Sequence, residues 1–180
     1  KKEILTIARD RYGIKPLYYA RQGSKFLFGS EQKAITANPA FNRMINKHAL
    51  LEYFTFQNIF TDQTFFNNIN LLPAGTFAEF SARKKKIDIK RYWDYDFSNS
   101  DKNIKENEYV EELDRLFEQA VNRHLLSDVE LGTYLSGGMD SGSITAVASK
   151  AFTNLKSFTV GFDLSSASGV ELNFDERIKA

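Results

Sequence analysis

The chain has 180 residues, 42% hydrophobic and 26% charged, and its 24 basic and 23 acidic residues leave a net charge of +1. This balance gives no global attraction to nucleic acid or to an anionic membrane, and no apolar run approaches the ~18 residues of a membrane span. Because the sequence contains no cysteine, disulfides, thiolate metal sites and a cysteine nucleophile are excluded within these residues, and a cytoplasmic protein is expected.

The first half of the sequence is predicted to form antiparallel hairpins. A short apolar strand is expected at residues 4–8, and a loop punctuated by Gly and Pro separates it from strands at 17–20 and 25–29. A glycine in the turn between those two strands favours a hairpin. A Pro-Ala-Gly sequence then leads into the strand predicted within 71–80, and the strand 87–93 runs back from a solvated basic tip.

Two helices are expected between these hairpins. Ser30 precedes the short helix 31–35, where its hydroxyl can accept the free N–H groups and Glu31 suits the positive end. Asn46 is predicted to cap a second helix at residues 47–54. The apolar side of this second helix is formed by Leu50, Leu51 and Phe54.

The composition changes at residues 94–107, which are rich in Asp, Asn, Ser and Lys and are predicted to link two units. Apolar residues at spacings of three and four then predict a helix that is capped by Asn107 and ends near Leu126. Strands are expected at 130–135 and 155–163, around a helix whose apolar face is Ile144, Val147 and Ala148. This strand–helix–strand order predicts a parallel sheet in the second unit.

The segment TYLSGGMDSGSIT, residues 133–145, places two glycines between the predicted strand and the predicted helix. Such a turn lets backbone N–H groups converge at a helix start that carries a partial positive charge, which favours an anion site. A Walker loop would need a lysine, which this segment lacks, and a dinucleotide fingerprint would need a different glycine spacing. A nucleophile elbow would need the serine one place earlier. Asp140 fits a phosphate cradle if a divalent cation bridges the two, and otherwise it caps the helix or bonds the turn.

The sequence LSGGMDS at residues 135–141 resembles the SGGxDS loop, or PP-loop, of ATP pyrophosphatases. Further segments follow the same order as in glutamine-hydrolysing asparagine synthetases, and together they resemble that family or a close amidotransferase relative over nearly the full chain. These segments are ARDRYGIKPLYY (8–19), FGSEQKAI (28–35), LLPAG (71–75), RHLLSDVELGTYLSGGMDS (123–141), SFTVGFD (157–163) and NFDERIKA (173–180).

The resemblance implies a fold in two parts. Residues 1–93 correspond to the C-terminal portion of a glutaminase (glutamine amidotransferase type 2) domain, an α+β antiparallel αββα sandwich of the Ntn-hydrolase class. Residues 94–107 correspond to a linker, and residues 108–180 to the start of an ATP-pyrophosphatase domain with an α/β parallel sheet of the adenine-nucleotide α-hydrolase-like class. The chain is therefore expected to be an excerpt of a longer enzyme, since its first residue is Lys1 and the family's N-terminal nucleophilic cysteine is absent.

The activity that the resemblance implies for the parent enzyme is ATP-dependent synthesis of L-asparagine from L-aspartate, with L-glutamine as nitrogen donor and β-aspartyl-AMP as intermediate. ATP and Mg²⁺ are the implied cofactors, Asp140 is the implied metal ligand, and a homodimer is allowed. No catalytic residue is assigned, and the excerpt alone is expected to be inactive. The implied ATP-binding residues are Leu135, Ser136, Gly137, Gly138, Asp140, Ser141 and Val160.

Three alternatives remain at this point. A related amidotransferase or cyclising enzyme could act on another carboxylate, a non-catalytic module could only bind nucleotide, and a serine hydrolase could use Ser136 or Ser141. In the first unit, Asp10 and Arg11 could be catalytic, but charged residues in a turn favour a structural role through turn formation and ion pairing.

Overall fold

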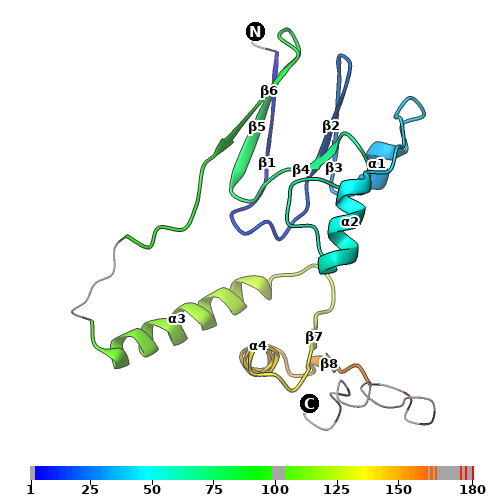
Figure 1. The fold of residues 1–180 in the computed structure, drawn as a ribbon. Coiled ribbons are helices and arrows are strands. Elements are labelled where there is room, and N and C mark those ends of the chain that lie inside the picture. Colours follow the sequence, from blue (N-terminus) through cyan, green and yellow to red (C-terminus); the bar gives the residue numbers. More distant parts are fainter. Residues whose placement is uncertain are drawn as a thin grey trace. The chain divides into compact units, whose positions relative to one another are not determined.

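Figure 1 shows the computed structural model, which describes residues 3–98 and 104–161 together with the single positions 163, 165, 175, 177 and 180. The chain divides into two units, Lys1–Asn99 and Ser100–Ala180, and each is described by itself. Residues 99–103 of the predicted linker and most of the segment 173–180 lie outside the described residues.

The first sheet of unit 1 has the strand order β1-β5-β6 and is antiparallel throughout. Its strands are β1 (Ile4–Ala8), β5 (Thr76–Ser81) and β6 (Lys86–Arg91). Burial alternates along β5, where Thr76, Ala78 and Phe80 point into the unit, as a strand with one solvated face requires. The structure confirms the predicted strand at 4–8 and the predicted hairpin with its basic tip.

The second sheet has the order β3-β2-β4, with β2 (Tyr18–Gln22), β3 (Lys25–Gly29) and β4 (Ile69–Leu71). It confirms the predicted hairpin, since Gln22 pairs with Lys25 around a turn in which Gly23 has φ +59°. The strand predicted to follow the Pro-Ala-Gly sequence is β5, which pairs with β1, whereas β4, before that sequence, was not predicted and pairs with β2. Pro73 lacks an N–H and Gly75 is left-handed, with φ +63°, so the chain turns from one sheet to the other between them.

The core of unit 1 lies between these two sheets. One buried cluster joins Ile7 of β1 and Ala78 of β5 to Tyr19 of β2. The ring of Phe26 in β3 stacks on that of Phe80 in β5, with centroids 4.8 Å apart. Two antiparallel sheets packed face to face agree with the sandwich predicted for this half of the chain.

The two helices of unit 1 are α1 (Gln32–Thr36) and α2 (Lys47–Phe56). The cap predicted for Asn46 is confirmed, since its Oδ1 accepts the N–H groups of His48 at 3.1 Å and Ala49 at 3.3 Å. The cap predicted for Ser30 is wrong: Glu31 occupies the N-cap position of α1, and its side chain makes no capping bond. Glu31 instead forms an exposed ion pair with Lys33, in the first turn of the helix.

The apolar side predicted for α2 is not the side that packs. Leu51 is 66% exposed and Phe54 75%, whereas Ala49 is buried. Four residues after Ala49, the ring of Tyr53 contacts the ring of Phe65 edge to face at 5.3 Å. Residues four apart share a helix face, so α2 packs on its unit through the stripe that contains Ala49 and Tyr53.

Unit 2 contains α3 (Glu106–His124), β7 (Gly132–Tyr134), α4 (Met139–Ser149) and β8 (Lys156–Phe158). The strands β7 and β8 pair in parallel, as the strand–helix–strand order predicted. Buried Val121 of α3 packs against Val147 and Ala148 of α4. Within the part of the chain that is described, no helix is long and apolar enough to cross a membrane.

The helix α3 begins two residues earlier than predicted. Lys105, not Asn107, is its N-cap, and the Lys105 N–H lies 3.4 Å from the Glu108 carboxylate. A carboxylate in the first turn faces the positive end of the helix dipole, so Glu108 stabilises this start both by that charge and by accepting the N–H.

Candidate functional site

The glycine pair lies in the connection between β7 and α4. Leu135 follows the last residue of β7, Gly138 is the N-cap of α4, and the helix begins at Met139. The predicted strand–turn–helix arrangement is therefore present, and the loop of residues 136–138 leaves the carboxyl end of a parallel strand. This edge of a parallel sheet is where open α/β folds bind ligands.

Each glycine of the pair is favoured at its position for a different physical reason. Gly137 has φ +69°, in the left-handed region where a side chain costs about 1–2 kcal/mol. A Cβ added to Gly138 would lie 3.3 Å from Ser136 Oγ, closer than an ordinary contact. Both positions thus keep the loop tight and its backbone open to an approaching group.

The hydroxyl of Ser141 joins the start of the loop to the first turn of α4. It accepts the Ser136 N–H at 3.1 Å, donates to the Gly138 carbonyl at 3.1 Å and lies 2.9 Å from Ser136 Oγ. A serine hydroxyl has one hydrogen and two lone pairs. Since its hydrogen goes to Gly138, the Ser136 hydroxyl is the donor in the third contact, and the bonding capacity of Ser141 is filled within the loop.

The N–H groups of the first turn of α4 are the donors that the loop leaves available. The first backbone bond that closes onto the N-cap is from Gly142 N to the Gly138 oxygen, at 3.0 Å. The N–H groups that precede Gly142 in an α-helix have no intrahelical partner, and Gly138 has no side chain to cap them. They point out of the helix start, where the dipole adds about half a positive charge.

Asp140 is exposed and lies in the first turn of α4. Among the described residues, no group of three or more His, Cys, Asp or Glu side chains is arranged to hold a metal ion. Asp140 is thus a single carboxylate beside the available N–H groups, and an anion at the loop would need a cation between the two.

The end of β8 lies against the start of the loop. Leu135 N–H donates to the Phe158 carbonyl at 2.9 Å, and the Thr159 hydroxyl donates to the Leu135 carbonyl at 2.8 Å. Val160 follows, 64% exposed. The structure therefore brings the predicted residues Leu135 and Val160 to neighbouring strand ends. Sequence reasoning missed Thr159, whose only signal was a hydroxyl residue beside the predicted strand end.

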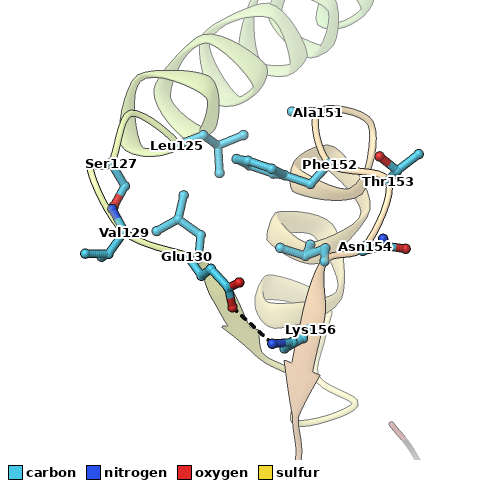
Figure 2. A pocket seen from close by; sticks show the side chains of 11 residues that line it. Leu125, Ser127, Val129, Glu130, Ala151, Phe152, Thr153, Asn154 and Lys156 are labelled. Carbon is cyan, nitrogen blue, oxygen red and sulfur yellow. Dashed lines mark hydrogen bonds and ion pairs between the residues drawn. The ribbon is translucent and has the colours of Figure 1, made fainter.

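Cavities of unit 2 lie away from the glycine loop. One has a volume of about 530 Å³, and in it Glu130 and Lys156 form an ion pair at 3.0 Å. Figure 2 shows this pair near Leu125 and Phe152. Glu130 precedes β7 and Lys156 begins β8, so this cavity lies at the amino ends of the strands, opposite the loop. Another, of about 360 Å³, is lined mainly by apolar side chains of α3 and α4.

In unit 1, Asp10 is a structural residue, as predicted. Its carboxylate accepts the N–H groups of Tyr12 at 3.2 Å, Ile14 at 3.0 Å and Lys15 at 2.9 Å. These bonds, above all the one from Lys15, hold the pKa of the Asp10 carboxyl below its ordinary value. The partners of Asp10 are thus backbone amides, and the predicted ion pairing is replaced by turn formation.

Arg9 links the same loop to Leu72, the residue that follows β4. The Arg9 guanidinium donates to the carbonyls of Gly13 at 2.6 Å, Lys15 at 3.0 Å and Leu72 at 2.8 Å. The Arg11 guanidinium lies over the Trp93 ring, 5.9 Å from its centroid. Both charged groups therefore have structural partners, and neither is oriented as a free catalytic group.

Comparison with known proteins gives two adjacent family matches. Residues 1–93 match the model of the glutamine amidotransferase domain, and residues 112–180 match that of asparagine synthase. Asparagine synthetase [glutamine-hydrolyzing] 3 of Bacillus subtilis (strain 168) is 40% identical over 153 residues, 84% of this chain and 24% of the relative. Asparagine synthetase [glutamine-hydrolyzing] 1 of the same organism is 34% identical over 171 residues, 94% of this chain and 26% of the relative. The chain spans about a quarter of the length of these relatives.

Proposed function

The chain belongs to the glutamine amidotransferase family, and from this premise we propose that it is part of an enzyme that makes L-asparagine from L-aspartate with L-glutamine as nitrogen donor. The observation that carries the proposal is the order of the two matched regions, an amidotransferase region followed by an asparagine synthase region. We assign residues 1–93 to the glutaminase domain, 94–107 to a linker and 108–180 to the ATP-pyrophosphatase domain.

The proposed reaction has two halves. Hydrolysis of glutamine releases ammonia, and the synthetase half joins the β-carboxylate of aspartate to the α-phosphate of ATP, so that pyrophosphate leaves and β-aspartyl-AMP forms. Ammonia then attacks the activated carbonyl, and asparagine and AMP are the products. The glutaminase nucleophile is not among these 180 residues, which contain no cysteine. The hydrogen-bonded Asp10 loop is then part of the scaffold of that half.

The glycine loop is the proposed site for the pyrophosphate portion of ATP. Its backbone N–H groups at the start of α4 supply donors, and the helix dipole adds positive potential. Ser136 and Ser141 shape the cradle through their mutual hydrogen bonds. The absence of side chains on Gly137 and Gly138 lets phosphate oxygens reach the backbone.

Asp140 fits the role of a magnesium ligand. Mg²⁺ takes oxygen ligands and keeps several waters, so one carboxylate together with phosphate oxygens suffices to hold it, and no dedicated cage is needed. Asp140 is exposed in the first turn of α4, beside the proposed phosphate site. The ion would neutralise the repulsion between that carboxylate and the triphosphate.

Leu135 and Val160 are the proposed contacts for the adenosine, through their backbone groups. Both follow parallel strands at the carboxyl edge of the sheet. The Leu135 carbonyl keeps a second lone pair beside the bond from the Thr159 hydroxyl, and Val160 lies beyond the last ladder bond. Their side chains remain free for packing. A cytoplasmic location and a homodimer belong to the same proposal.

Isotope transfer tests the proposed reaction in the whole protein that carries this chain. With [amide-¹⁵N]glutamine, aspartate, ATP and Mg²⁺, we expect ¹⁵N in the side-chain amide of asparagine and equal amounts of asparagine, AMP and pyrophosphate. Formation of ADP and phosphate, or labelled ammonia without labelled asparagine, would contradict it. Other carboxylates offered in place of aspartate would reveal a different acceptor.

A further inference from the structure

We propose that Thr159 is a positioning residue for the nucleotide site, because its hydroxyl fixes the orientation of the peptide between Leu135 and Ser136. This inference rests on the proposed function. It concerns a side chain that sequence reasoning did not assign. It follows from two hydrogen bonds that meet the same peptide unit from opposite sides.

The first bond replaces a backbone donor at the end of the sheet. The parallel ladder between β7 and β8 runs as far as the bond from Leu135 N–H to the Phe158 carbonyl, at 2.9 Å. In a parallel ladder the Leu135 carbonyl would next accept an N–H from the chain that follows β8. Here it accepts the Thr159 hydroxyl at 2.8 Å, so a side chain extends the ladder by one step.

The second bond meets the other end of the peptide. The Ser136 N–H donates to Ser141 Oγ at 3.1 Å. In a trans peptide the C=O and the N–H point in opposite directions within one plane, and no cis peptide occurs among the described residues. Thr159 from β8 and Ser141 from α4 thus hold the plane of the Leu135–Ser136 peptide between them.

This peptide connects both parts of the proposed nucleotide site. Leu135 contributes backbone to the adenosine side, and Ser136 opens the loop that receives the phosphates. If the peptide rotates, the left-handed Gly137 next to it offers little resistance, because glycine has the widest range of backbone conformations. The Thr159 hydroxyl therefore preorganises the loop from a strand 24 residues away in sequence.

Thr159→Val tests the inference in the whole protein, because valine keeps the branched shape and removes the hydroxyl. Thr159→Ser restores the hydroxyl, and Thr153→Val changes an exposed threonine before β8 as the matched control. We expect Thr159→Val to raise the Kd for MgATP about tenfold, as the loss of one well-placed hydrogen bond predicts. Thr159→Ser and Thr153→Val should bind within about twofold of the unaltered protein, and glutamine hydrolysis should not change in any variant.

Unchanged MgATP affinity in Thr159→Val, or equal weakening in Thr159→Ser and Thr159→Val, overturns the inference and leaves the proposed function standing. Absence of MgATP binding by the unaltered protein overturns both. If Thr159→Val no longer unfolds cooperatively, Thr159→Ala takes its place in this comparison. Alanine removes the hydroxyl without placing a methyl group there.

Discussion

The hydroxyl groups of Ser136 and Ser141 lie 2.9 Å apart, so the residue that opens the glycine loop is bonded to the residue that completes the first turn of α4. The same Ser141 hydroxyl holds the Ser136 N–H and the Gly138 carbonyl. The loop is thereby closed by its own side chains, which leaves the backbone N–H groups of the helix start as the donors for a ligand.

Removal of the Ser141 hydroxyl should weaken nucleotide binding by loosening this loop. In Ser141→Ala we expect the Kd for MgATP to rise about tenfold, and the free energy of unfolding to fall by roughly 1 kcal/mol, the usual contribution of a hydrogen-bonded hydroxyl. Titration calorimetry and thermal unfolding measure the two effects. The control is Ser149→Ala, since Ser149 lies on the same helix and bonds only to the Ala146 carbonyl. Equal effects in both variants would contradict the role given to Ser141.

The two glycines at 137 and 142 should respond in opposite ways to alanine. Gly137 has φ +69°, whereas the space around Gly142 within α4 is empty to 4 Å. Gly137→Ala should cost about 1–2 kcal/mol of stability and lower MgATP affinity. Gly142→Ala should raise stability by up to about 1 kcal/mol, because alanine is the better helix former. Chemical denaturation of the two variants compares them directly, and a stabilised Gly137→Ala would show that the left-handed backbone is not required.

Asp140 should govern the magnesium dependence of nucleotide binding. In Asp140→Asn we expect ATP to bind with nearly the same affinity with and without Mg²⁺, because the carboxylate that requires the cation is gone. Asp128→Asn removes another exposed carboxylate, which precedes β7, and it should keep the full magnesium dependence. Calorimetric titration with ATP at several Mg²⁺ concentrations tests this. An undiminished magnesium effect in Asp140→Asn would rule out Asp140 as the ligand.

The Asp10 loop should lose stability in acid. The pKa of Asp10 is lowered in the folded chain, mainly by the Lys15 N–H, so the ionised carboxylate is stabilised by folding. That stabilisation is fully present above the ordinary pKa of 3.8 and is lost as the pH falls through the lower folded value.

Asp10→Asn should therefore lower the melting temperature at pH 7, and its difference from the unaltered protein should shrink below about pH 4. Asp94→Asn is the control, since Asp94 forms an ion pair with Arg91 in which both side chains are more than half exposed, and it should change little. If the difference in melting temperature stays constant from pH 7 to pH 3, the hydrogen bonds of the Asp10 carboxylate are not its cause.

Local signals predicted much of the fold, because they act within a few residues. The alternation along β5 follows from its own side chains, and Asn46 bonds N–H groups two and three residues ahead. The packed side of α2 could not be predicted, since it depends on contact between Tyr53 and Phe65, which lies beyond the helix. Sequence reasoning likewise placed the glycine loop between strand and helix, whereas Thr159 reaches Leu135 across 24 residues and needed the strand pairing to be seen.

The most direct test of the central claim is a crystal structure of the whole protein with Mg²⁺ and α,β-methylene-ATP, which the enzyme cannot split between the α and β phosphates. We expect phosphate oxygens about 2.9 Å from backbone nitrogens at the start of α4, and an Asp140 carboxylate oxygen about 2.1 Å from the ion. A triphosphate bound elsewhere, with the loop of residues 136–141 making no contact to it, would contradict the account.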